Sequence, residues 1–317
     1  MVQTHAIPRL IATSVIRGRQ KLDSQGGVFL VDMELERVVL ALDWNTAGID
    51  WQSRGFELGL RGIACTPDAV YLAAGDELFA YSPQFKLLGS WRNEYLKQCR
   101  GIALHQGKLF LASGAFDSIL AFDLEQRKFD WAMHINVKQY RFKGAQFDPN
   151  GADGPLPLNK LELTDVFCNS AGMYISGRNT GGLLHFNGTT VLMTAELPPG
   201  ALNARPFREG VLYIDNEMSA LRYCGRTDSK EDRALPLPAH NPAGLQHADT
   251  DFSGEAQAGF GRGLCVVNER AVAVGTSPAT VTLYDLQKNR RLFSVNLSRD
   301  VRTAIHSVAI WPYLGSF

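Results

Sequence analysis

The stretch Arg61-Gly62-Ile63-Ala64 returns 39 residues later as Arg100-Gly101-Ile102-Ala103. In both copies an aromatic residue stands ten positions after the arginine, Tyr71 in the first and Phe110 in the second. Around these positions apolar residues alternate in short runs, which Gly, Asn, Asp and Ser interrupt. Short alternating runs with turn residues between them are typical of β-strands. The pattern therefore indicates an all-β protein built from a repeated unit.

The same unit occurs at three further places in the chain. Its first strand starts at Thr164, Asn203 and Arg262, and each start is followed ten residues later by Tyr174, Tyr213 or Val272. A third and a fourth strand pattern complete each unit. Four strands in about 40 residues is the period of a β-propeller blade. The alternative is a β-sandwich with accidental similarity, and the repeated Arg-Gly-aliphatic start favours the propeller.

The two ends of the chain supply a sixth unit. Residues 306–311 form a first-strand pattern with nothing after it, whereas second-, third- and fourth-strand patterns occupy residues 9–13, 28–32 and 38–42. We therefore predict an all-β, six-bladed β-propeller, one domain over residues 1–317, in which the C-terminal strand completes the N-terminal blade. Closure of this kind leaves no unpaired strand between the two chain ends.

Composition excludes several classes of protein. The 317 residues include 32 Lys and Arg and 32 Asp and Glu, so the formal net charge is zero and predicts neither nucleic-acid nor anionic-membrane binding. The sequence contains no run of 18 apolar residues, so we predict no membrane span, and the N-terminal residues lack the pattern of a signal peptide. The five cysteines are far apart and odd in number. We therefore expect reduced thiols in a cytoplasmic protein.

The starts of the six first strands are expected to meet around the central channel. By the register of the units these residues are Arg61, Arg100, Thr164, Asn203, Arg262 and His306. Clustered guanidinium groups repel one another unless an anion or nearby acids compensate them, and their planar fork fits carboxylates and phosphates. We predict that Arg61, Arg100 and Arg262 bind an anionic small molecule, while Thr164 and Asn203 orient its polar groups.

His306 is the member of this ring that titrates near neutral pH, so it is the candidate catalytic acid or base. Two alternatives remain open at this point. Each arginine can instead pair with an acidic residue on an adjacent turn, such as Asp76, Asp117 or Glu217. His306 can likewise be a hydrogen-bonded structural residue.

Two long insertions, residues 136–162 and 239–261, are expected on the same face as the ring. Loops of this length are typical of lids and binding loops, and blade packing or a partner surface is the alternative. His240 and His247, in the second insertion, are candidate substrate-binding residues. We predict no cofactor. Two metal sites are alternatives: a calcium loop beginning at Asp249, which lacks the bidentate Glu at its twelfth position, and a transition-metal site of His240, His247, Asp249 and His306.

The repeated pattern resembles six-bladed propellers of the NHL and SMP-30-like kind, and more narrowly a bacterial propeller family with Arg-Gly-aliphatic first strands. The resemblance covers nearly the whole chain and implies a fold that serves lactonases, lyases, synthases, sugar-binding proteins and scaffolds. In SMP-30-like enzymes Glu, Asn and Asp at inner-strand positions hold a calcium ion. This chain has mostly arginine at the equivalent register, which argues against a calcium lactonase.

Two classes of function follow from these observations. The first is a non-redox enzyme of lyase, isomerase or hydrolase type that acts on an anionic substrate at the channel mouth. The second is a non-catalytic propeller that holds a protein partner through the long loops. An open positive well favours the enzyme, whereas a well closed by Arg–acid pairs, with apolar loop tips exposed, favours the scaffold.

Overall fold

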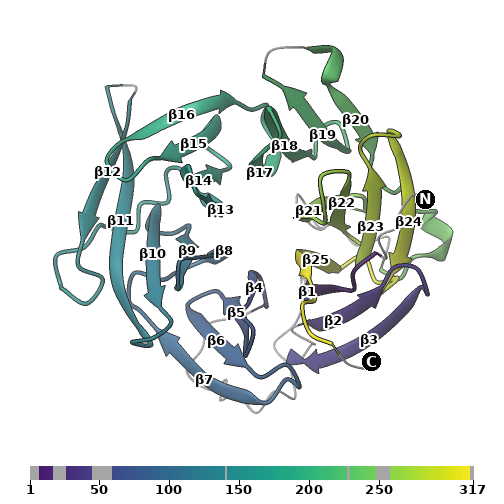
Figure 1. Ribbon diagram of the computed structural model, residues 1–317, viewed down its shortest axis with the longest axis horizontal. Helices are drawn as coiled ribbons and strands as arrows, with labels where there is room; N and C mark the ends of the chain where they lie inside the picture. The colour runs from purple at the N-terminus through teal and green to yellow at the C-terminus, as the bar shows by residue number, and fades with distance from the viewer. Residues whose placement is uncertain are drawn as a thin grey trace.

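The computed structural model describes residues 7–16, 26–44, 59–139, 141–226, 229–247 and 258–314. These residues form six antiparallel sheets arranged as blades around one axis (Figure 1), which confirms the predicted six-bladed propeller. From the axis outward, blade 1 contains β25 (Thr303–Ile310), β1 (Leu10–Ile16), β2 (Gly27–Asp32) and β3 (Arg37–Asp43). Blade 2 contains β4 (Ile63–Cys65), β5 (Val70–Ala74), β6 (Glu77–Tyr81) and β7 (Leu87–Arg92).

Blade 3 contains β8 (Cys99–His105), β9 (Lys108–Ser113), β10 (Ser118–Asp123), β11 (Lys128–Lys138) and β12 (Arg141–Phe147). Blade 4 contains β13 (Leu163–Asn169), β14 (Gly172–Gly177), β15 (Gly182–Phe186) and β16 (Val191–Glu196). Blade 5 contains β17 (Ala201–Phe207), β18 (Gly210–Asp215), β19 (Ala220–Gly225) and β20 (Arg233–Pro236). Blade 6 contains β21 (Gly261–Val266), β22 (Ala271–Thr276), β23 (Thr280–Asp285) and β24 (Arg290–Asn296). Two short 3-10 turns, η2 (Ser229–Glu231) and η3 (Pro242–Gly244), lie in connections.

The C-terminal strand closes the ring as predicted. β25 pairs antiparallel with β1, from Leu10 opposite Ile310 to Ile16 opposite Thr303. The chain beyond β25 then crosses to blade 2, where the Tyr313 hydroxyl donates to the carbonyl oxygens of Thr66 and Ala69 at 2.6 and 2.7 Å. The two ends of the chain therefore hold blades 1 and 2 together.

Apolar side chains fill the spaces between neighbouring blades. Among the described residues each of the six interfaces has its own buried cluster, and five of these clusters contain eleven to thirteen buried residues. The sixth, between blades 4 and 5, contains only Leu183, Ala201, Ala204 and Tyr213. The ring is therefore packed less tightly at this interface than at the others.

The glycine of the Arg-Gly repeat allows neighbouring inner strands to come close together. A Cβ atom on Gly101 would lie 2.7 Å from Cα of Asp165 on the next blade, and one on Gly62 would lie 2.5 Å from Cγ2 of Ile102. Gly263, at the equivalent position of blade 6, has a φ of +79°, which favours glycine. The register of inner strands also breaks near this position in blades 3 to 6, and such bulges redirect side chains.

The first insertion differs from the predicted loop over residues 136–162. Residues up to Phe147 extend β11 and form β12, a fifth strand on the outside of blade 3, because Ile135, Val137 and Phe142 continue the alternation of a strand. Beyond Phe147 the chain crosses the end of blade 3. There the backbone N–H of Lys160 donates to Oδ2 of Asp117 at 2.6 Å, so the end of the insertion is fixed at the channel mouth.

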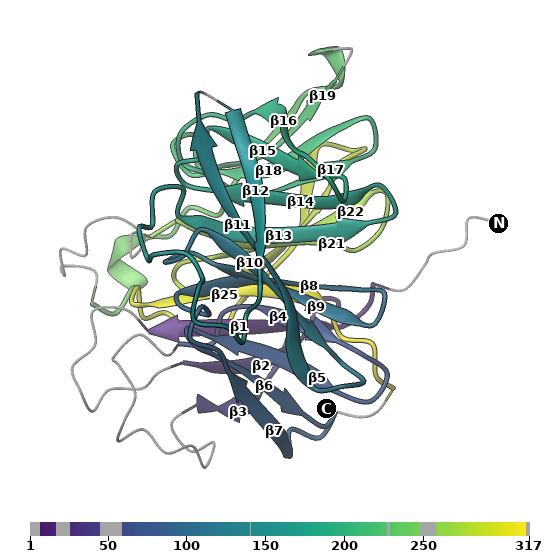
Figure 2. The same ribbon diagram turned by 90° about the vertical axis from the view of Figure 1, so that its left-hand side faces the viewer.

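The connection between blades 5 and 6 carries η3. Figure 2 shows the ring edge-on, with η3 on one side of the disc. In the described part of the chain, no helix has the length and apolar character needed to cross a membrane.

Candidate functional site

Three arginines and one glutamate meet at the channel mouth. Arg100, on β8, places Nη1 3.1 Å from Oε1 of Glu162. Glu162 is at the end of the first insertion, and this segment brings its carboxylate to the axis. Arg178, in the turn between β14 and β15, places Nε 3.4 Å from the same oxygen. Arg262, on β21, is only 4% exposed. Glu162 is thus the counter-ion nearest to several guanidinium groups.

The pKa values of the arginines show that their charges act on one another. Burial and, to a smaller extent, the charge of Arg100 lower the pKa of Arg262 to about 9, while Glu162 and Asp165 act in the opposite direction. Burial is also the main cause that lowers the pKa of Arg178, Glu162 raises it, and the charges of Arg262 and Arg100 lower it. The three guanidinium groups are therefore close enough to repel one another.

A second polar cluster lies below the mouth on β13 and β17. Nδ2 of Asn203 donates to Oδ2 of Asp165 at 3.0 Å, and Nη2 of Arg205 lies 3.5 Å from the same oxygen. The Arg205 guanidinium also sits over the ring of Phe167, 5.4 Å from its centroid. The backbone of Asn203 has a φ of +54°. Its Oδ1 accepts a hydrogen bond from the N–H of Gly263 in blade 6, so the side chain of Asn203 connects Asp165 of blade 4 with blade 6.

The channel contains a cavity of about 320 Å³ bounded by all six inner strands, of which β4 of blade 2 contributes only Ile63. The polar side chains that line it include Arg100, Asp165, Asn203, Arg205 and His306. This volume is at the lower end of the range for small-molecule sites. His306 is 5% exposed and shares the cavity with Asp165, so two groups able to exchange protons lie in one confined space.

The structure brings some of the predicted ring residues together. Arg100, Asn203 and His306 line the same cavity, and Arg100 is close enough to Arg262 for its charge to lower the pKa of Arg262. The other two ring members are placed differently. The Thr164 hydroxyl donates to the carbonyl oxygen of Ser176 at 3.4 Å, within its own blade. Arg61 does not line the cavity, and its charge acts on the Cys99 thiol.

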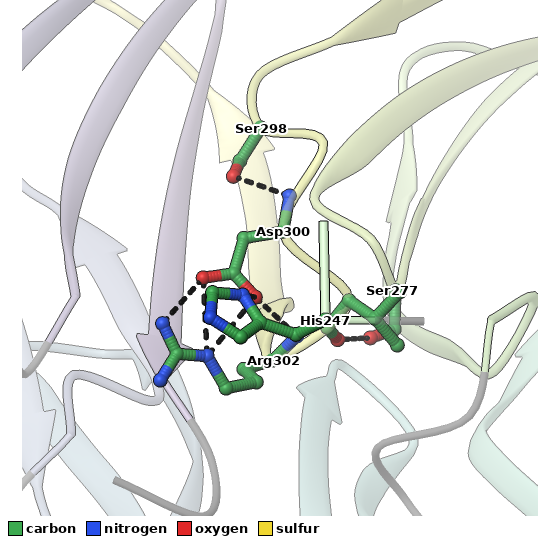
Figure 3. A network of polar contacts seen from close by, with 6 residues as sticks. His247, Ser277, Ser298, Asp300 and Arg302 are labelled. Carbon is green, nitrogen blue, oxygen red and sulfur yellow. Dashed lines mark hydrogen bonds and ion pairs between the residues drawn. The ribbon is translucent and has the colours of Figure 1, made fainter. Parts of the chain in front are cut away.

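The histidines of the second insertion lie away from the channel cavity. Nδ1 of His247 is 3.3 Å from Oδ1 of Asp300, which also binds Arg302 at 2.7 Å (Figure 3). The His247 side chain is 46% exposed, and burial lowers the pKa of His240. Neither residue lines the channel cavity. The calcium-loop pattern starting at Asp249 lies outside the described residues.

Sequence reasoning missed four charged residues that shape the site: Glu162, Asp165, Arg178 and Arg205. Two of them had a detectable signal. Asp165 directly follows the ring residue Thr164, and Arg205 lies two positions after Asn203, on the same side of the strand in an ideal alternation. Arg178 belongs to the glycine-rich segment 176–182, whose sequence pattern indicates only a turn between two strands. Glu162 had no signal, because its position depends on the path of the insertion.

The substitution Asp165→Asn is expected to remove a pH-dependent loss of stability. Burial raises the pKa of Asp165 above its ordinary value of 3.8, against the opposing effects of Arg205 and Asn203. A raised pKa contributes stability that is fully present below about pH 4 and is lost as the pH rises through the folded-state pKa. The free energy of unfolding of the wild type minus that of the variant, from urea titrations between pH 4 and 7, should fall with rising pH. A constant difference would contradict this assignment.

Comparison with solved structures supports the six-bladed architecture. The chain is similar over 96% of its length to a chain in the crystal structure of a nidogen/laminin complex, of which it covers 97%, with a TM-score of 0.57 and 12% identity. It is also similar over 96% of its length to a protein of unknown function from Bacteroides caccae, of which it covers 100%, with a TM-score of 0.55 and 10% identity. At these identities the likeness shows the fold alone. No family model and no curated protein matches the sequence.

Proposed function

We propose that the protein binds a small molecule with a carboxylate or phosphate group at the mouth of its central channel. The observation that carries this proposal is the convergence of Arg100, Arg178 and Arg262 at the mouth, where Arg100 and Arg178 contact Glu162 and the charge of Arg100 acts on the buried Arg262. Guanidinium groups that lie so close together repel one another, and a bound anion would reduce this repulsion. The guanidinium fork also supplies the geometry that recognises carboxylate and phosphate oxygens.

The cavity below the mouth would hold the rest of the ligand. Its volume of about 320 Å³ suits a compact metabolite, and Asn203 and Arg205 offer hydrogen-bond donors near it. Were the bound anion a substrate, His306 and Asp165 would be the groups that move protons, in the non-redox chemistry of a lyase, isomerase or hydrolase. Anion binding does not require this chemistry. We therefore propose anion binding as the first function of the site and catalysis as the second.

A second candidate function, binding of a protein partner, has its own observation. Leu156 and Leu158, on the segment that crosses blade 3 toward the mouth, are 70% and 55% exposed. The ion pair of Arg100 with Glu162 also neutralises part of the positive charge at the channel mouth. Exposed leucines beside a partly compensated mouth are the arrangement expected of a scaffold. A double variant, Leu156→Ser with Leu158→Ser, that keeps the full rise in unfolding temperature with anions would show that the leucine surface and the channel function independently.

Anion binding is tested by the unfolding temperature in citrate and in phosphate. Both anions should raise it at constant ionic strength, and at one hundred times the dissociation constant the stabilisation would be about 2.7 kcal/mol. Arg262→Met should abolish the rise, because the variant lacks the buried cation whose charge is disfavoured in the free protein.

The matched control is Arg302→Met, which removes an arginine that binds Asp300 outside the channel cavity. This variant should keep the full rise. The proposal fails if citrate and phosphate leave the unfolding temperature of the wild type unchanged, or if Arg262→Met responds to them as the wild type does.

A further inference from the structure

The interface between blades 4 and 5 has the smallest buried apolar cluster of the six interfaces in the described part of the chain. Its buried cluster has four members, and a cleft of about 640 Å³ lies beside it, twice the volume of the channel cavity. Small residues explain the gap, since Ala201 and Ala204 occupy the interface and Ala195 and Gly210 line the cleft. At the interface of blades 3 and 4, by contrast, Trp131, Phe142 and Phe186 pack into the corresponding space.

The wall of the cleft on blade 4 carries two aromatic side chains that stack on each other. Tyr174 on β14 and His185 on β15 stand opposite each other in the sheet register, and their rings stack with centroids 4.5 Å apart and planes 22° apart. Nε2 of His185 lies 2.9 Å from the carbonyl oxygen of Ala171, which fixes the orientation of the imidazole. Both residues are half-buried and line the cleft. A third planar ring that enters the cleft can pack against this ordered pair.

The charges around the cleft are balanced, unlike those of the channel mouth. Its ionic side chains are two arginines, Arg208 and Arg226, and two glutamates, Glu196 and Glu209. Arg208 is also engaged outside the cleft, where it donates to the carbonyl oxygen of Glu269. The opposite wall, on blade 5, presents the Tyr213 hydroxyl beside Sγ of Cys224, 3.6 Å away. These groups suit hydrogen bonds to the edge of a ligand without net charge.

We infer that the cleft between blades 4 and 5 binds an uncharged planar heteroaromatic molecule, whose ring packs against the stacked pair of Tyr174 and His185 while its polar edge faces the glutamates and arginines. The volume of about 640 Å³ is within the range of small-molecule sites. This site is separate from the channel, since none of its lining residues lines the channel cavity. The inference is therefore independent of the proposed anion binding.

The test uses adenosine and nicotinamide as uncharged heteroaromatic probes and glucose as a non-aromatic control. Saturation-transfer NMR and calorimetry should detect the two heteroaromatic probes at millimolar concentration and should not detect glucose. Tyr174→Ala should weaken the binding of both probes about 10-fold or more, because stacking of a base on an aromatic side chain is worth about 1–3 kcal/mol. Tyr174→Phe keeps the aromatic face and should retain most of the affinity.

Two further variants separate a binding site from a packing defect. Tyr71→Ala changes the tyrosine at the same repeat position of blade 2, where the interface is filled, and should leave probe binding unchanged. Ala195→Phe fills the cleft and should abolish binding while the response to citrate remains. Absence of binding of both heteroaromatic probes to the wild type would overturn the inference, as would binding that survives Tyr174→Ala or equally strong binding of glucose.

Discussion

A protein that ends at Arg302 is expected to lose its cooperative thermal unfolding transition. The deletion removes β25, which is the inner strand of blade 1 and pairs with β1 along its whole length. It also removes Ile305 and Val308 from the core between blades 6 and 1, and Trp311, which stacks on Phe85 of blade 2 with ring centroids 5.7 Å apart. Two interfaces are opened at once, so the loss should exceed that of any single substitution. Circular dichroism during heating gives the measurement.

The same deletion can be tested by rescue. A synthetic peptide of residues 303–314, added to the truncated protein, should restore the cooperative transition, whereas a peptide of scrambled sequence should not. A truncated protein that unfolds cooperatively within a few degrees of the full chain would show that the ring does not need this strand.

The substitution Asp117→Gly is expected to lower the free energy of unfolding by about 2–5 kcal/mol. Asp117 is 2% exposed, and its two carboxylate oxygens accept from the backbone N–H groups of Lys160 and Leu161 at 2.6 and 3.1 Å. Without the carboxylate, the two backbone N–H groups lose their hydrogen-bond acceptor in a largely buried environment. Glycine tolerates the φ of +47° at this position, so the loss reports the carboxylate rather than backbone strain. Urea titration monitored by tryptophan fluorescence gives the measurement.

Asp123→Gly is the matched control for this substitution. Asp123 also accepts from two backbone N–H groups, those of Glu125 and Gln126, but in an exposed turn, so the control should cost less. Asp117→Gly should also increase the rise in unfolding temperature caused by citrate, because Glu162 is then held less firmly against Arg100. Equal losses for the two variants, with an unchanged response to citrate, would contradict the role given to Asp117.

The architecture was predictable from the sequence because the same local packing constraint applies in each blade. The inner strands must approach closely at the axis, so glycine recurs after the mouth residue, as at Gly62, Gly101 and Gly263. Short apolar runs bounded by turn residues then mark the strands that bury both faces between blades. These constraints act within about 40 residues, and a repeat search detects them. The same regularity predicted that the C-terminal strand completes blade 1.

The chemistry of the mouth was less predictable, because it depends on residues that the repeat does not align. Glu162 reaches Arg100 only because the preceding insertion is anchored by Asp117, a contact between residues more than 40 positions apart. The predicted loop over residues 136–162 also concealed β12, whose pairing with β11 was not considered in the prediction. Repeat spacing therefore located the ring of arginines but not the acids that modify its charge.

Completion of blade 1 by β25 has a consequence for biosynthesis. The inner partner of β1 spans residues 303–310 and is translated nearly 300 residues after β1 itself. During this interval the hydrogen-bonding edge of β1 is available to other strands, and contacts of such high sequence separation form slowly. Protection by chaperones would matter most in this period, and dilution rather than added stability should be the more effective way to improve the yield of refolding.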